Sequence, residues 1–407
     1  MFDAIVVGAR CAGAATALLL ARKGHRVLIV DKATFPSEIP HGHFVHRQGP
    51  RLLQSWGVLE KVVRSGCPPV TSFTSDFGDF PLTGTDLVCD GVAFGYGPRR
   101  ALLDHALLEM AIAAGAEFRN QFIVEEYLMK GEAVTGIRGR SADGRAQAIE
   151  NATIVIGADG RHSSLARAVS APVYDEVPRL TCWYFSYWSG APLDGLHVYI
   201  RGQNVIFAFP TNDSLTAVFI AWPLSELARV RASVENSFME VLRSASPVGE
   251  CILSGRREER FYGAADLPNF FRKPYGVGWA LVGDAGHHKD PYLALGICDA
   301  FRDADLLATA IDEGFSGKRR IAAALAVYET ARNSAASQLY WENISLARFG
   351  PVPEDILGLR SALRPDPEET RRFYMAREGM IPPEEFFNQE NLRRLKMRQD
   401  PATATRL

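Results

Sequence analysis

Cysteine is scarce in this sequence, and long apolar runs are missing. The six cysteines are scattered through 407 residues, with no C-x-x-C pair and no spacing typical of a metal site. We therefore expect reduced thiols, as in a cytoplasmic protein, rather than a disulfide framework. No apolar run approaches ~20 residues, so no membrane span is expected. The chain enters a strand pattern at once, which predicts that it carries no signal peptide.

An excess of either charge is also lacking. Lys and Arg number 45 and Asp and Glu number 47, for a net charge of −2, so no basic field for nucleic acid is present. Three histidines, His41, His43 and His46, lie in one loop punctuated by Gly and Pro, without a carboxylate or cysteine in step. We predict no metal site there. The length and the 47% hydrophobic content suit a globular enzyme of two domains.

The first 32 residues form the pattern around which the chain is organised. Asp3–Val7 reads as a buried strand, Gly8–Gly13 as a tight turn and Ala14–Arg22 as a helix. Arg26–Val30 is a second strand, and Asp31 ends it. This order of strand, turn, helix, strand and acid is that of a dinucleotide-binding unit.

The geometry of such a unit explains its chemistry. A helix N-terminus binds a pyrophosphate, Gly8 permits the turn, and Gly13 permits close packing of helix on strand. Asp31 is placed to accept hydrogen bonds from a ribose and would repel a 2′-phosphate, so the tightly held nucleotide is not of the NADP type. Arg10 stands where the second motif glycine is usual, and its guanidinium either lies beside the phosphates or points outward. The alternative is an ordinary strand–helix turn with chance glycines.

A second motif follows another buried strand, Thr153–Ile156. The strand runs into Gly157-Ala158-Asp159-Gly160 and then a serine-capped helix. Asp159 either binds a ribose or ribityl hydroxyl or fixes the N–H groups of its own loop, and Arg161 and Arg167 are placed to flank phosphates. A plain strand–helix corner is the alternative.

The third motif begins where a buried strand ends at Gly283-Asp284. A loop passes Pro291, and a helix is expected from Gly296, with apolar residues at helical spacing. Its free N–H groups near Leu295 would face whatever lies over the first unit. A flavin gains negative charge on its pyrimidine edge when reduced, which a helix N-terminus stabilises. Asp284 would hold the ribityl chain.

The middle of the chain predicts a second domain. Residues 179–222 are rich in strand signals, and their aromatic residues indicate an antiparallel sheet with one aromatic face. That face either walls an apolar pocket or is core. Residues 71–97 are expected as an excursion into this domain, and residues 51–62, 100–114 and 224–242 as helices.

The three motifs, in this order, resemble those of the FAD-dependent aromatic hydroxylases, the single-component flavoprotein monooxygenases. Their relatives include geranylgeranyl reductases and flavin-dependent halogenases, and the resemblance covers roughly residues 1–330. Arg100 matches the arginine usually found near the flavin. The resemblance implies these FAD-binding residues: Gly8, Arg10, Cys11, Ala12, Gly13, Asp31, Lys32, Arg100, Asp159, Gly283, Asp284, Pro291, Gly296 and Ile297. Two departures are His288-Lys289-Asp290, in place of apolar or proline-rich residues, and Leu293-Ala294-Leu295, in place of a glycine-rich turn.

The fold that the resemblance implies is α/β, and α+β overall. A Rossmann-like FAD-binding domain is expected from residues 1–70, 98–170 and 271–335. An inserted antiparallel substrate domain is expected from residues 71–97 and 171–270, followed by a tail of helix and loop over 336–407.

The activity that the resemblance implies is oxygen transfer. The expected enzyme holds FAD, receives electrons from transient NADPH or NADH, and uses O2 through a flavin hydroperoxide. It hydroxylates or epoxidises a small aromatic or polycyclic substrate in natural-product tailoring. The residues expected to bind this substrate are Trp183, Phe185, Tyr187, Phe207, Phe209 and Tyr292. His43, His288 and Tyr292 are the catalytic candidates, as groups that deprotonate a phenol.

Two other activities stay open. Phe207-Ala208-Phe209-Pro210 echoes the aromatic strand of geranylgeranyl reductases, which suggests a reductase of isoprenoid double bonds. A non-catalytic, flavoprotein-like binding protein is the other. The halogenase motif W-x-W-x-I-P is missing from the sequence. Either a monomer or a homodimer is expected, with no nucleic acid partner.

Overall fold

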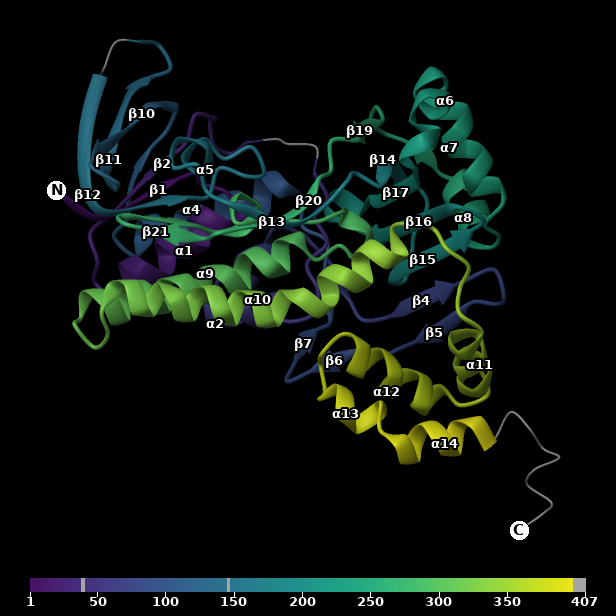
Figure 1. The fold of residues 1–407 in the computed structure, drawn as a ribbon. Coiled ribbons are helices and arrows are strands. Elements are labelled where there is room, and N and C mark those ends of the chain that lie inside the picture. The colour runs from purple at the N-terminus through teal and green to yellow at the C-terminus, as the bar shows by residue number, and fades with distance from the viewer. Residues whose placement is uncertain (38–40, 145–146, 398–407) are drawn as a thin grey trace.

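The computed structural model describes residues 1–37, 41–144 and 147–397, so positions 398–407 of the expected tail lie outside it. Two sheet-based units lie side by side, and helices from the C-terminal part of the chain pack beneath both of them (Figure 1). None of the helices in the described ranges is long and apolar enough to span a membrane.

The first unit is built on a parallel sheet. Its strands, in spatial order, are β9 (Glu117–Arg119), β2 (Val27–Val30), β1 (Phe2–Val7), β12 (Gln147–Gly157) and β22 (Trp279–Leu281). Ala4 and Val6 face one apolar cluster and Ile5 and Val7 face another. Burial on both faces explains why these strands read as continuous apolar runs. The expected α/β fold is confirmed.

Helices cover both faces of this sheet. One face carries α1 (Cys11–Arg22), α2 (Gly49–Ser55), α3 (Leu59–Arg64), α4 (Arg100–Ala113), α9 (Gly296–Phe315) and α10 (Ile321–Leu346). The other face carries α5 (Ser164–Ala168), β10 (Phe122–Lys130) and β11 (Ala133–Ser141). The strands β10 and β11 extend the first half of β12 as an antiparallel ribbon, and β21 (Tyr275–Gly276) pairs with β22.

The second unit is a mainly antiparallel sheet. Its order is β18 (Arg256–Arg257), β14 (Thr181–Ser189), β17 (Thr216–Pro223), β16 (Asn204–Pro210), β15 (Leu196–Arg201), β4 (Phe73–Asp76) and β5 (Leu82–Gly84), with β19 (Tyr262–Ala264) beside β14. One face packs on α6 (Leu227–Ala232), α7 (Val234–Arg243) and α8 (Val248–Ser254). The other face is aromatic, and residues 71–97 supply β4 and β5 at its edge.

Short elements link the two units. A three-stranded sheet joins β13 (Val173–Val177), β20 (Asn269–Arg272) and β23 (His287–His288). The small pairs are β3 (Pro69–Val70) with β8 (Gly95–Tyr96), and β6 (Val88–Cys89) with β7 (Val92–Ala93). Single 3-10 turns are η1 (Asn212–Ser214), η2 (Leu224–Glu226), η3 (Gly283–Ala285) and η4 (Pro291–Leu293).

The C-terminal helices close the aromatic side of the second sheet. They are α11 (Glu354–Leu363), α12 (Pro367–Arg377), α13 (Pro383–Phe386) and α14 (Gln389–Met397). Arg360 of α11 is buried, and it donates to both carboxylate oxygens of Asp79 at 2.8 and 2.9 Å and to Ser75 Oγ at 2.7 Å. Tyr374 of α12 bonds the same strand through Ser75 Oγ. These bonds fix the helices to the β4–β5 hairpin.

Three expected elements differ from the structure. The helix expected over 51–62 is two helices, because Gly57 adopts a φ of +69° between them. The helix expected over 224–242 is divided at Ser233, whose backbone is not helical. The boundary expected at residue 336 falls inside α10, which continues because the first later proline is Pro351.

We expect Arg360→Leu to lower the free energy of unfolding by about 3 kcal/mol, because the Asp79 carboxylate is left partly buried without its cation. Residues 354–397 should then become protease-sensitive before the parallel sheet. Chemical unfolding and limited proteolysis measure both effects. Arg371→Leu is the matched control, because Arg371 is partly exposed, pairs with Glu368 at 3.4 Å and donates to the carbonyl of Asp86 at 3.2 Å. Such surface contacts are weak, so the free energy of unfolding should change by less than about 1 kcal/mol. Equal effects in both variants would contradict this account.

Candidate cofactor and substrate site

The three predicted motifs meet at one edge of the parallel sheet, where β1, β12 and β22 all end. Gly8 has a φ of +106°, and a Cβ on it would lie 2.4 Å from the carbonyl oxygen of Ala158. A Cβ on Gly13 would lie 1.8 Å from the carbonyl oxygen of Gly8. Only glycine fits these two positions, because Gly8 touches the second turn and Gly13 packs on the first turn itself. Ligands bind outside the carboxyl ends of such strands.

The first turn leads directly into α1, which begins at Cys11. Asp31 accepts hydrogen bonds from the backbone N–H groups of Ala9 and Ala33, both at 2.8 Å, and so holds the turn to the next loop. Each carboxylate oxygen keeps a second lone pair for a ligand hydroxyl. A terminal nitrogen of Arg10 lies 3.5 Å from Ser37 Oγ, and its buried Nε has no hydrogen-bond partner in the part of the chain that the structure describes.

Asp159 fixes its own loop, which is one of the two roles that the sequence suggests for it. Its Oδ2 accepts from the backbone N–H and the hydroxyl of Ser164, at 2.6 and 2.7 Å. Its buried Oδ1 accepts no hydrogen bond from residues 1–37, 41–144 or 147–397. Ser163 caps α5 by accepting from the N–H of Ala166 at 3.1 Å.

Arg100 lies in the first turn of α4 and donates to both oxygens of Asp104, at 3.1 and 2.9 Å. Burial alone would lower the pKa of Arg100, but Asp104 raises it. The thiol of Cys11 lies 3.0 Å from Asp104, and burial raises the pKa of that thiol well above its usual range. This chain of contacts joins α1 to α4 with a neutral thiol and a permanent cation.

The polar atoms left over suit a flavin dinucleotide. Arg10 Nε, Arg100 Nε, Arg161 Nε and Asp159 Oδ1 are buried without a hydrogen-bond partner among the described residues, although Arg161 Nε lies 3.7 Å from Asp266. Burial and the charges of Arg100, Arg10 and Arg161 lower the pKa of His41 to about 4, with the charge of Asp284 opposing them. Guanidinium donors suit a pyrophosphate, and carboxylate acceptors suit ribose and ribityl hydroxyls. The residues present therefore fit FAD.

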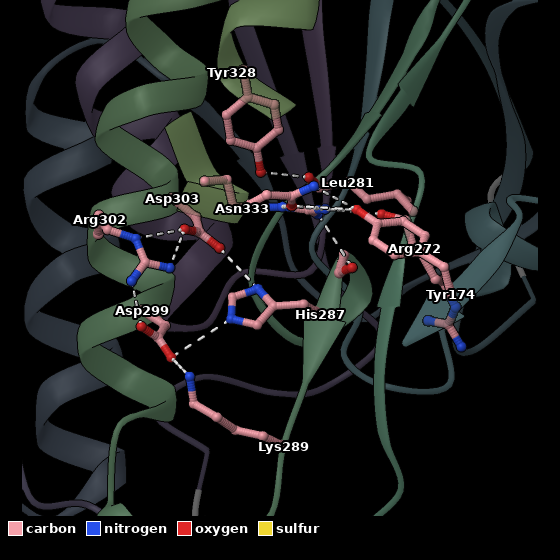
Figure 2. A network of polar contacts seen from close by, with 12 residues as sticks. Tyr174, Arg272, Leu281, His287, Lys289, Asp299, Arg302, Asp303, Tyr328 and Asn333 are labelled. Carbon is pink, nitrogen blue, oxygen red and sulfur yellow. Dashed lines mark hydrogen bonds and ion pairs between the residues drawn. The ribbon is translucent and has the colours of Figure 1, made fainter. Parts of the chain in front are cut away.

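A buried charge network joins Asp299, Arg302 and Asp303 of α9 to His287 and Lys289 (Figure 2). His287 lies between two carboxylates, with Nδ1 3.2 Å from Asp303 and Nε2 3.6 Å from Asp299. Arg302 pairs with Asp299 at 2.6 Å and Asp303 at 2.7 Å, and Lys289 pairs with Asp299. Sequence reasoning missed Asp299, Arg302 and Asp303, although their spacing of three and four residues placed them on one side of a helix.

The predicted aromatic face exists, and it reaches the loop before α9. All six residues expected to bind the substrate belong to one apolar cluster: Trp183, Phe185, Tyr187, Phe207, Phe209 and Tyr292. Among these six, Phe207 and Tyr292 are half-buried and the other four are buried. Tyr292 packs edge to face on Trp183, with ring centroids 6.5 Å apart. A relay of hydrogen bonds strengthens this contact: Trp183 Nε1 donates to Thr181 Oγ1 at 2.8 Å, which donates to Asp290 at 2.6 Å.

His43 is buried against this face with both ring nitrogens engaged. Nδ1 lies 3.1 Å from the carbonyl of Gly97, and Nε2 lies 3.0 Å from the hydroxyl of Tyr187. Burial, aided by Arg99, lowers the pKa of His43 to about 3. The network then assigns a neutral ring that donates to Gly97 and accepts from Tyr187.

Burial also shifts the pKa values of the other two catalytic candidates. Burial lowers the pKa of His288, whose Nδ1 contacts the carbonyl of Pro268. Burial raises the pKa of Tyr292 to about 12.

His46 has a different partner from His43. It pairs with Glu378 of the C-terminal region at 2.7 Å, while its backbone N–H and carbonyl contact the thiol of Cys298 in α9. Sequence reasoning did not connect Glu378 to this site, because 332 residues separate it from His46. Among the residues described, no group of three His, Cys, Asp or Glu side chains gathers as a metal site would.

We expect Asp284→Ala to weaken FAD retention about 30-fold, because a carboxylate that accepts ribityl hydroxyls contributes about 2 kcal/mol. Flavin absorbance per protein after gel filtration measures occupancy, and titration of the stripped protein gives the dissociation constant. Asp305→Ala, on the exposed side of the same helix–loop region, should retain a full load. A full flavin load in both variants would show that Asp284 does not hold the cofactor.

Known proteins of similar sequence carry out flavin chemistry. The chain is 27% identical over 378 residues to kynurenine 3-monooxygenase of Salinispora arenicola, covering 85% of this chain and 79% of that protein. It is 27% identical to 6-methylpretetramide 4-monooxygenase of Streptomyces rimosus, covering 77% and 75%. The fold matches the solved myxobacterial chondrochloren halogenase CndH, with a TM-score of 0.77 at 19% identity, over 98% of this chain and 96% of that one.

The sequence model of the FAD binding domain family matches residues 1–342, which contain all three strand-end motifs. NAD(P)H is the typical co-substrate of such enzymes. The chain therefore belongs to the FAD binding domain family, within the group of flavoprotein monooxygenases and their relatives, and is a FAD-dependent oxidoreductase.

Proposed function

We propose that this oxidoreductase is a monooxygenase that takes electrons from NADH or NADPH and transfers one oxygen atom of O2 to a small aromatic or polycyclic compound. The observation that carries the proposal is the contact between Tyr292, in the loop before α9, and Trp183 of the aromatic face. Stacked and edge-on aromatic contacts favour a planar apolar ligand. Two relatives named as monooxygenases support oxygen transfer as the reaction.

The pKa values of the three catalytic candidates bear on the kind of aromatic ring that the enzyme accepts. Burial lowers the pKa of His43 to about 3 and raises the pKa of Tyr292 to about 12, which makes both poor proton acceptors near pH 7, and burial also lowers the pKa of His288. We therefore propose that His43 orients the Tyr187 hydroxyl and that the preferred ring is electron-rich as it stands, as an indole is. FAD, when bound, supplies the redox and oxygen chemistry. The protein holds the substrate against the aromatic face and keeps water away from it.

The deciding assay uses the full FAD-loaded chain in air. Consumption of NADH and NADPH, oxygen uptake and product mass are followed together for indoles, phenols and polycyclic aromatics. A substrate-stimulated rate with one oxygen atom gained supports the proposal. Reduction of a substrate double bond without oxygen gain would replace it with a reductase, and halide incorporation in the presence of bromide would replace it with a halogenase. No reduction by either nucleotide would indicate a binding protein.

Because we propose that no protein group removes the phenol proton, the pH dependence of turnover should differ between substrates. Indole turnover should vary little between pH 6 and 9, whereas phenol turnover should rise with pH toward the phenol's own pKa of about 10. The phenolate, not the phenol, is the electron-rich form, and bulk water must then remove the proton. A phenol rate that levels off near pH 7 would reveal a base in the protein.

We expect Phe207→Leu to raise KM for the aromatic substrate about tenfold, because one aromatic contact contributes about 1 to 1.5 kcal/mol. FAD content should stay unchanged. Phe261→Leu is the matched control, since Phe261 belongs to the cluster on the opposite side of the sheet, against α6–α8. Steady-state kinetics on both variants check the effect, and an equal KM change in both would assign it to general loosening of the sheet.

A further inference from the structure

The charge network on α9 contains Lys289, at a position where the flavoprotein monooxygenases usually have an apolar residue or proline. The side chain of Lys289 is 4% exposed, and that of its partner Asp299 is 7% exposed. A buried ammonium is costly unless it is paired. The pairing explains how Lys289 is tolerated but not why a charge is placed there.

Lys289 and Asp299 share a cavity with the residues expected to contact FAD. The cavity is small, with a volume of about 20 Å³, and is lined by Gly283, Asp284, His287, Lys289, Gly296 and Asp299. Asp284 is the expected ribityl ligand, and Gly296 begins α9, whose N-terminus should face the flavin pyrimidine ring. Both members of the ion pair therefore border the space where the cofactor's redox-active end is expected.

The network contains two cations and two carboxylates. Lys289 and Arg302 are cations, and Asp299 and Asp303 are anions. Burial would raise the pKa of Asp299, but Lys289 and Arg302 hold it well below its usual range. Asp303 likewise has a lowered pKa, because Arg302 and His287 outweigh its burial. Both carboxylates are thus ionised, and removing any one charge leaves a net charge of known sign beside the cavity.

We propose that Lys289 and Asp299 set the reduction potential of bound FAD with opposite signs. FAD gains negative charge on its pyrimidine ring when it is reduced. The Lys289 ammonium stabilises that charge and raises the potential, while the Asp299 carboxylate opposes it. The effect is large because the pair is buried, where charges are poorly screened. The inference rests on FAD binding and not on the proposed substrate.

The test measures the two-electron potential of the FAD-loaded chain by anaerobic titration against a reference dye, without substrate. Lys289→Met should shift the reduction equilibrium at least tenfold toward oxidised FAD, which is about 30 mV for a two-electron couple. Asp299→Asn should shift it in the opposite direction by a similar factor. The double variant, with neither charge, should return to within about threefold of the original protein.

Opposite shifts that cancel are not expected of a structural role, which would move all three variants the same way or release FAD. Lys289→Gln covers the case in which the Met variant loses its cofactor, because the amide still donates to Asp299 but carries no charge. Its potential should fall as well, and an unchanged potential in a FAD-loaded Gln variant would overturn the proposal. Lys273→Met removes a surface ion pair with Glu329 outside the cavity and should leave the potential unchanged.

Discussion

Parallel strands all point the same way, and the site depends on this constraint. The ends of β1, β12 and β22 meet at one edge of the sheet although they come from distant parts of the chain. Gly8 approaches the carbonyl of Ala158, and a Cβ on Gly283 would lie 2.8 Å from the Cβ of Ala12. The three turns are therefore mutually locked. A cofactor bound to all three is positioned by the strand register rather than by flexible side chains.

Burial at this edge requires the charges to come in compensated sets. Arg100 faces Asp104, and the carboxylates of α9 face Lys289 and Arg302. A single buried charge would cost several kcal/mol, so each ion is tolerated because its partner lies beside it. The partner is on the same helix for Arg100 with Asp104 and for Arg302 with Asp303, and on a separate element for Lys289 with Asp299. These pairs also attach the elements: Arg100 and Asp104 connect α4 through Cys11 to α1, and Lys289 connects β23 to α9. The same contacts hold the fold together and shape the field at the cofactor.

Local patterns predicted the elements and motifs well, because a strand, turn and helix are written in consecutive residues. The glycines of the first turn and the start of α9 at Gly296 followed from spacing alone. The pairing of His46 with Glu378 did not, because nothing local marks a contact 332 residues away. The state of His43 was equally hidden: its type suggests a base, but burial against Arg99, Phe209 and Tyr187 decides its basicity. Sequence therefore indicates which groups are present more readily than what charge they carry.

The C-terminal helices contact the second sheet and are linked to the start of α9. The family match ends at residue 342, before the helices that close the aromatic side of the second sheet. Arg360 fixes those helices to β4, and Glu378 carries an ion pair back to His46, whose backbone touches the first turn of α9. A change in the C-terminal helices can therefore reach the start of α9 through His46 and Cys298.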